Sequence, residues 1–466
     1  MTDSTVAELC RLTVRAPARS IDLAVPSDVP VADLLPTLLR YVGEEAEESG
    51  LDHAGWVLQQ AGDAPLDEEG TLAQAGLADG AVLYLRPHTE ALPEARLDDL
   101  VDGIADTAGR RLHNWSPQAT RIFLAGAAVA AVLAALVLLF RPGLPADSRV
   151  LCAAVAGLLI LAGAGSASRA VGDRVSAAAL GSLVAPCLAL AGWVLPGGDV
   201  TGPDAVQVIG ARLLAAGAAG AGGAVLALAA TAVGAPMLLA TAVVSVAGAV
   251  SGVLMGFAGL DPQAAVAIVA TVTSLCAGFM PALAFKLAGM RMPALPSSAQ
   301  QLQEGIEPYR GDEVAERTEL AGRWITALFG ATGVIAAAAL FPLTHRPGLA
   351  EVLTSLALSV LLLLHARGLV HVGQRLTLAA PGILGLLLLA HAWARSAEPG
   401  GRTVVFAVLL GVAAALTVAA WTVPGRRMLP YWGRAAEIAH TLFAVALLPL
   451  ALWVAGLFGW LRGLFG

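Results

Sequence analysis

Long apolar segments constrain this chain more than any other feature, and they follow one another from residue 120 almost to its end. A helix of about 20 residues rises about 30 Å, the thickness of the hydrocarbon layer of a bilayer. A single water-soluble core could not bury so many apolar residues, since only 14% of the chain is charged and its mean hydropathy is +0.74. The sequence therefore predicts a polytopic membrane protein, an all-α bundle of about eleven transmembrane helices. The spans are predicted at residues 120–140, 149–169, 175–196, 206–231, 236–258, 262–285, 323–343, 349–367, 376–395, 402–423 and 434–458.

The boundary between the fourth and fifth predicted spans is the least marked, because residues 233–236 (Val-Gly-Ala-Pro) carry no charge. A single helix over 206–258 would be about 80 Å long, far more than a bilayer requires. We therefore expect two spans here.

Basic residues mark the cytoplasmic loops of membrane proteins. With eleven spans and a cytoplasmic N-terminus, the inner flanks and loops hold fifteen Lys and Arg residues and the outer ones hold six. Ten spans would place Arg426 and Arg427 outside, against this rule. We therefore expect a multi-pass plasma-membrane protein with a cytoplasmic N-terminus, a cytoplasmic loop at 286–322 and an extracytoplasmic C-terminus.

The first 87 residues have a different pattern and predict a small α+β domain, which we call the head. Its strand segments alternate apolar and polar residues, and its helix segment repeats apolar residues at intervals of three and four. Strands are expected at residues 9–16, 19–25, 56–59 and 81–85, with a helix at 30–42. The expected order is β-β-α-β-β.

This order and its turn residues resemble the ubiquitin-like (β-grasp) fold. The most specific stretch follows Gly62 and reads L-x-x-x-x-T-L-x-x-x-G-L-x-D-G-x-x-L-x-L from Leu66 to Leu85. Ubiquitin conjugation requires a free terminal Gly-Gly, whereas this chain continues through Arg86 and Pro87. The resemblance therefore implies a docking module.

A linker at 88–119 joins the head to the transmembrane domain at 120–466. It carries an apolar stripe typical of a short amphipathic helix. The stripe consists of Leu97, Leu100, Val101, Ile104, Ala108 and Leu112. Packing on the head and binding to a partner both fit this pattern.

Motifs for nucleotide or catalytic chemistry are missing from the sequence. The single lysine, Lys286, follows Phe285 rather than Gly, which excludes a P-loop, and no HExxH, GxSxG or GxGxxG motif stands in a suitable context. Residues 1–115 carry a net charge of −13 and residues 116–466 one of +6. A nucleic-acid-binding face would need clustered basic residues. We expect no enzyme activity, no cofactor and no nucleic-acid partner.

Polar residues within the spans are also few. His365, His371 and His391 lie near span ends without an accompanying carboxylate, which favours interfacial positions over a metal or proton site. Arg212 lies about six residues into its span, shallow enough for its side chain to reach the membrane surface. A secondary transporter for small molecules, with the head as a regulatory domain, is the alternative function, but it would need polar groups at mid-membrane.

Small residues are abundant, and Gly248, Gly252 and Gly256 form a double GxxxG motif. This spacing allows close approach of helix backbones. The contact could lie within one chain or between two protomers, and the sequence leaves both open.

The fusion of a ubiquitin-like head to eleven spans resembles the EccD family, a membrane component of actinobacterial type VII (ESX-type) secretion systems. The segment 426–436 is similar to the family's R-x-S-P-x-W-G-R-x-A stretch, with Leu429 where Ser is frequent. The matching residues are Arg426, Arg427, Pro430, Trp432, Gly433 and Arg434. The segment 290–296 also resembles a proline-rich family segment, with Ala294 in place of one proline.

The resemblance implies a non-catalytic structural subunit that forms homodimers around a lipid-filled vestibule. It further implies partners of the EccB, EccC and EccE types, where EccC is an FtsK-like ATPase that the head would contact. The missing P-loop fits this picture because the motor would be a separate subunit.

Overall fold

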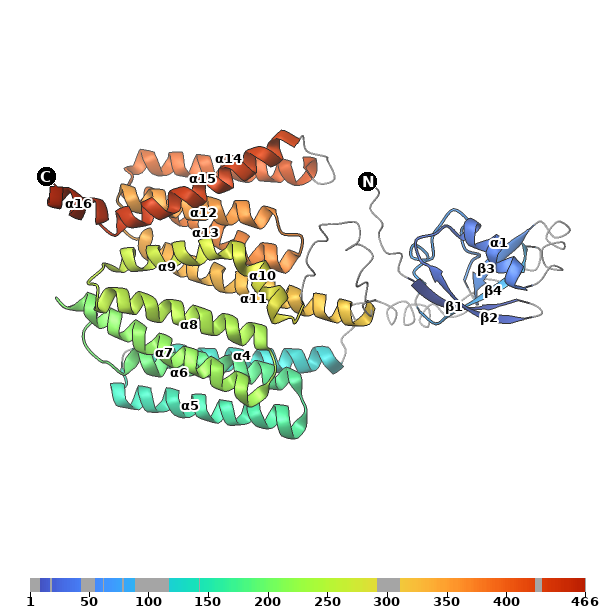
Figure 1. Ribbon diagram of the computed structural model, residues 1–466, viewed down its shortest axis with the longest axis horizontal. Helices are drawn as coiled ribbons and strands as arrows, with labels where there is room; N and C mark the ends of the chain where they lie inside the picture. The colour runs from blue at the N-terminus through green and yellow to red at the C-terminus, as the bar shows by residue number, and fades with distance from the viewer. Residues whose placement is uncertain are drawn as a thin grey trace, which may run out of the picture. The chain divides into compact units, whose positions relative to one another are not determined.

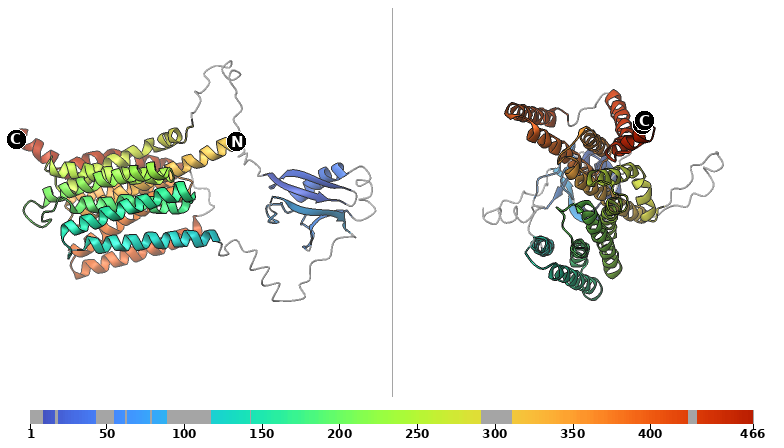
Figure 2. Two further views of the ribbon diagram at one scale, coloured as in Figure 1. Left: turned by 90° about the horizontal axis from the view of Figure 1, so that it is seen from below. Right: turned by 90° about the vertical axis from the view of Figure 1, so that its left-hand side faces the viewer.

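The computed structural model describes residues 9–16, 19–42, 55–61, 63–77, 79–88, 117–141, 143–290, 311–423 and 430–465. The chain divides into two compact units, Met1–Trp115 and Ser116–Gly466. Figures 1 and 2 show the elements of each unit. The amphipathic helix predicted within 88–119 falls on residues outside the described ranges, apart from the ends of that segment, and stays a prediction.

In its described residues the head contains one four-stranded mixed sheet and one helix (Figure 1). Its elements are β1 (Leu9–Arg15), β2 (Ser20–Pro26), α1 (Val31–Val42), β3 (Trp56–Gln60) and β4 (Ala81–Pro87). The strand order is β2-β1-β4-β3, with β1 and β4 parallel and the outer pairs antiparallel. The predicted order β-β-α-β-β is confirmed.

The core of the head follows from the alternation of its strands. Alternate β1 residues, Cys10, Leu12 and Val14, are buried, and so are Leu83 and Leu85 of β4. Side chains of α1 at helical spacing pack on the same cluster. The head therefore has an apolar core of its own.

Eleven helical segments among the described residues are long and apolar enough to cross a membrane, which confirms the predicted number. They are α4 (Pro117–Phe140), α5 (Ala146–Ser166) with η2 (Ala167–Val171), α6 (Arg174–Val194), α7 (Ala205–Thr231), α8 (Ala235–Gly256), α9 (Pro262–Cys276) with η3 (Ala277–Phe279) and α10 (Met280–Leu287), α11 (Gly311–Leu343), α12 (Leu349–Arg367), α13 (Val372–Ser396), α14 (Pro399–Thr422) and α15 (Pro430–Val454). A short helix, α16 (Leu457–Phe465), follows the last span.

The sixth span changes helix type in its second half. The 3₁₀ turn η3 separates α9 from α10, and Pro281 lies in the first turn of α10. Proline has no backbone N–H and its ring crowds the preceding turn, so an uninterrupted α-helix is disfavoured here.

The seventh span begins earlier than the sequence predicts. Helix α11 starts at Gly311, so residues 311–322 of the expected 286–322 loop are helical. This segment is polar, but ion pairs one turn apart join Glu313 to Arg317 and Glu319 to Arg323. Such pairs support a helix outside an apolar environment, whereas hydropathy detects only the apolar part.

The membrane unit is packed in two ways. Helices α6, α7 and α8 approach through glycines: a Cβ atom added at Gly217 would lie 2.4 Å from the Ser245 carbonyl oxygen. Helices α9, α11, α12, α13 and α15 instead share a core of larger side chains, among them Phe329, Leu340 and Leu358. Helices α5 and α14 lie at opposite edges of the bundle (Figure 1).

Candidate functional site

The described part of the segment 426–436 forms the first residues of α15. Arg426 and Arg427 lie outside the described residues, and Pro430 is the first residue of the helix. The side chains of Trp432 and Arg434 are exposed. The carbonyl oxygen of Gly433 accepts a hydrogen bond of 3.4 Å from Nη2 of Arg367, at the end of α12. This contact joins the segment to α12.

A histidine pair reinforces the same contact between helices. Nδ1 of His365, in the last turn of α12, lies 3.3 Å from Nε2 of His440 on α15. The ring of Phe329 packs edge-on against His365, with 5.3 Å between ring centroids. A neutral imidazole both donates and accepts a hydrogen bond, so the two rings can bind each other directly. We call Arg367, Gly433, His365 and His440 the α12–α15 seam.

The sequence named His365 but missed its partner. His440 lies seven residues, or two helical turns, after Gly433, and this spacing places both residues on the face that meets α12. The other two predicted histidines do not join the pair: His371 precedes α13, and His391 is exposed on α13.

The described ranges contain no group of three or more His, Cys, Asp or Glu side chains that could hold a metal ion. Two imidazoles alone leave a typical zinc site two ligands short. Chemically, the α12–α15 seam can serve as a polar connection between two membrane helices.

The three glycines of the double GxxxG motif occupy different surroundings. A Cβ atom added at Gly252 would lie 2.5 Å from the Gly210 carbonyl oxygen and from the Leu214 nitrogen of α7. Within the described part of the chain, and apart from the nearby backbone of α8 itself, no atom lies within 4 Å of a Cβ atom built at Gly248 or Gly256. Gly252 therefore meets α7 directly, and the backbone nitrogen of Gly256 also lies 2.8 Å from a Cβ atom built at Gly210 of α7. A contact between protomers at Gly248 or Gly256 stays a prediction.

Several arginines near the ends of the predicted spans bind carbonyl oxygens at, or just after, the C-terminal ends of neighbouring helices. Arg169 donates from Nε and Nη2 to the carbonyl oxygens of Ala230 and Ala229 at the end of α7, at 2.9 and 2.8 Å.

Arg212 donates to the carbonyl oxygens of Gly197 and Gly198, just after α6, and its guanidinium lies 5.8 Å from the centroid of the Trp193 ring. Equivalent contacts to the ends of α4, α10 and α11 come from Arg149, Arg317 and Arg395. A cation at a helix C-terminus compensates both the unpaired carbonyls and the helix dipole.

Comparison with known protein families decides the assignment. The family model described as "EccD-like transmembrane domain" matches residues 120–464. The chain belongs to the EccD family. In this EccD-family chain the head also matches a second model, "WXG100 protein secretion system (Wss), protein YukD", over residues 9–85, and the ubiquitin-like prediction for the head is confirmed.

Curated relatives cover almost the whole chain. It is 28% identical over 474 residues to the ESX-4 secretion system protein eccD4 of Mycobacterium tuberculosis (strain H37Rv). The alignment covers 98% of this chain and 97% of the relative. It is 24% identical over 482 residues to the ESX-5 secretion system protein EccD5 of Mycobacterium marinum, covering 93% and 90% of the two chains.

Two solved structures share the fold. Protomer 1 of the ESX-3 core complex aligns with a TM-score of 0.56 at 19% identity, over 97% of this chain and 100% of that chain. The MycP5-free ESX-5 inner membrane complex aligns with a TM-score of 0.57 at 20% identity, over 88% and 99%.

Proposed function

We propose that this protein is a non-catalytic membrane subunit of an ESX-type VII secretion machine, on which a separate ATPase docks through the head. The observation that carries the proposal is the pair of matches in one chain, to the EccD transmembrane domain and to YukD, together with an ESX-4 relative that aligns over nearly the whole length of both proteins. The head has its own apolar core, which suits an independent docking module.

A homodimer with lipid between its two copies is part of this proposal, as are partners of the EccB, EccC and EccE types. The exposure of whole helices supports it. Only 6% of the residues in the apolar windows of α4 and α14 are buried within the chain. Surfaces of this size in a membrane must contact lipid or other helices.

Purification from native membranes in a mild detergent tests the proposal. We expect the full-length protein to bring down an FtsK-like ATPase and a second copy of itself. Leu83 is fully buried in the head, so Leu83→Asp should unfold the head and release the ATPase while the dimer persists. Leu9, which is 60% exposed on the same sheet, provides the matched control Leu9→Asp.

Recovery of a lone monomer from gently solubilised native membranes would contradict the scaffold function. Saturable solute flux in proteoliposomes containing only this protein would favour the transporter instead.

A further inference from the structure

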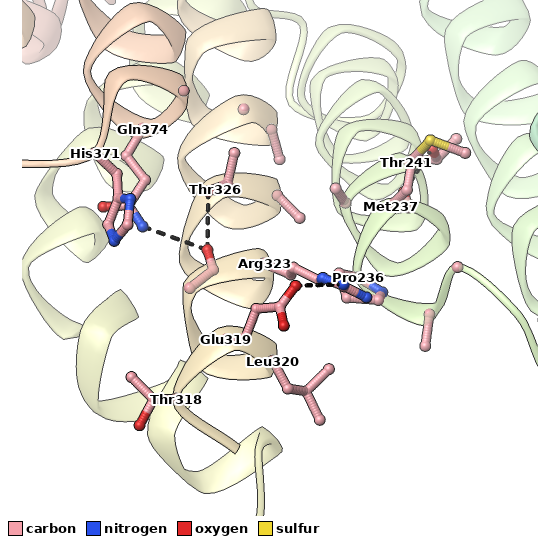
Figure 3. A pocket seen from close by; sticks show the side chains of 18 of the residues that line it. Pro236, Met237, Thr241, Thr318, Glu319, Leu320, Arg323, Thr326, His371 and Gln374 are labelled. Atoms are coloured by element: carbon pink, nitrogen blue, oxygen red, sulfur yellow. Dashed lines mark hydrogen bonds and ion pairs between the residues drawn. The ribbon is translucent and has the colours of Figure 1, made fainter. Parts of the chain in front are cut away.

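A groove of about 1460 Å³ opens between α8, α11 and the start of α13 (Figure 3). All its lining residues come from one chain, so it exists without a second copy. Its deep walls are small and apolar, with Ala240 and Val244 on α8 and Ala327, Ala331 and Val334 on α11. An apolar chain can therefore lie between the two helices.

Polar side chains gather at the opposite end, which we call the mouth. Figure 3 shows Glu319 and Arg323 of α11 joined as an ion pair there. Across the mouth, Gln374 is only 6% exposed and its Nε2 donates to the Gly322 carbonyl oxygen at 3.3 Å. His371 also lines this part of the groove. The groove thus combines a charged end with an apolar interior.

The length of the apolar part of the groove, from Arg323 inward, identifies the kind of occupant. The lining residues Ala315, Thr318, Glu319 and Leu320 belong to the polar start of α11. From Arg323 to Val334 the α11 wall rises about 17 Å, and from Ala235 to Val244 the α8 wall rises about 14 Å. These lengths are about half of the 30 Å hydrocarbon layer. A transmembrane helix of a partner would need a groove across the whole layer, whereas a lipid acyl chain occupies one leaflet.

The charges of the mouth identify the head group. The side chains of Arg323 and Glu319 are 66% and 68% exposed, so each keeps hydrogen-bonding capacity beyond their mutual contact. A guanidinium binds phosphate with two parallel N–H donors, and a carboxylate accepts hydrogen bonds from an ammonium group. Opposite charges one helical turn apart are complementary to a head group that carries both a phosphate and an ammonium.

We propose that this groove binds one phospholipid of the phosphatidylethanolamine type. The phosphate binds Arg323, the ammonium binds Glu319, and one acyl chain lies between α8 and α11. A purely anionic phospholipid satisfies Arg323 but meets the negative charge of Glu319.

Native mass spectrometry of the full-length protein, titrated with phosphatidylethanolamine or phosphatidylglycerol of identical acyl chains, tests the proposal. We expect the wild type to prefer phosphatidylethanolamine. Glu319→Gln removes the ammonium contact and should reduce that preference about tenfold, whereas Arg323→Gln should weaken both lipids by about the same factor. Glu313→Gln is the matched control, because Glu313 forms the equivalent pair with Arg317 outside the groove.

A third variant, Ala327→Phe, fills the apolar part and should abolish binding of both lipids. The exposed charge variants leave the helix core intact, so they decide the question even where Ala327→Phe fails to fold. Preference for phosphatidylglycerol in the wild type, or equal lipid binding by the wild type, Glu319→Gln and Arg323→Gln, would overturn the proposal.

Discussion

At the scale of single residues, glycines and arginines make important contacts between the membrane helices of this chain. Gly217 and Gly252 let the backbone of α7 approach that of α8 so closely that even a methyl group would meet backbone atoms. Arg169 and Arg212 close the ends of neighbouring helices with paired hydrogen bonds to carbonyls. Stability here comes from backbone proximity and from compensated helix ends.

Gly252→Ala and Gly248→Ala should therefore act in opposite directions. At Gly252 the new Cβ meets Gly210 and Leu214 of α7, and overpacking of this kind costs about 1–3 kcal/mol. At Gly248 the Cβ meets no described atom, and alanine favours the helix by up to about 1 kcal/mol. Thermal unfolding in detergent should show a lower midpoint for Gly252→Ala only.

Equal midpoints for Gly252→Ala and the wild type would contradict the close α7–α8 contact. If Gly248→Ala dissociated the proposed homodimer, that residue would belong to the contact between protomers.

At the scale of elements, the starts and ends of helices depend on particular side chains. Asp173 precedes α6, and one carboxylate oxygen accepts hydrogen bonds from the amides of Val175 and Ser176 at 3.0 and 3.2 Å. The Ser176 hydroxyl donates to the other oxygen at 2.7 Å. Hydrogen bonds from the Ser176 side chain and backbone hold the pKa of Asp173 below its ordinary value of 3.8.

The capping contribution of Asp173 should consequently depend on pH. Because the folded-state pKa is lowered, the stabilisation is fully present above pH 3.8 and disappears as the pH falls through the folded-state value. Amide exchange of the first turn of α6, corrected for intrinsic rates, should rise in that range. Asp173→Asn caps without titrating, so its protection should not change with pH. If the amide protection of this turn in the wild type did not change with pH, the capping role of Asp173 would be contradicted.

The same scale separates what the sequence predicts from what it does not. The strands of the head and the eleven spans are visible locally, because alternation and hydropathy depend on neighbouring residues. The contact of His365 with His440 joins positions 75 residues apart, and it depends on how α12 packs on α15. The groove between α8 and α11 is likewise a product of packing, so no local pattern indicates it.

At the scale of the whole molecule, the orientation of the eleven spans stays a prediction. The prediction rests on an excess of basic residues on the cytoplasmic side. The structure shows that two of these residues, Arg169 and Arg317, also bind the ends of neighbouring helices. The two roles are compatible because both place a cation at a membrane surface.

Cysteine labelling can test this orientation. Glu398→Cys lies between α13 and α14, and Gly368→Cys lies between α12 and α13. In intact cells, an impermeant maleimide should label position 398 and spare position 368, and both should react after permeabilisation. The native protein is the control, because Cys10 is buried and Cys152, Cys187 and Cys276 lie within the spans. Labelling of position 368 alone would reverse the orientation.

The order of strands in the head has a mechanical consequence. Strand β4 lies between β1 and β3 and is the last strand among the described residues of the head, so the segment that leads toward the membrane unit follows a strand in the middle of the sheet. Tension between the head and the membrane unit would pull on the end of β4 and load the ladders on both sides in shear. Bonds loaded together resist force better than bonds that open one at a time. If an ATPase docks on the head as proposed, force between that ATPase and the membrane unit would pass through β4 and its two ladders.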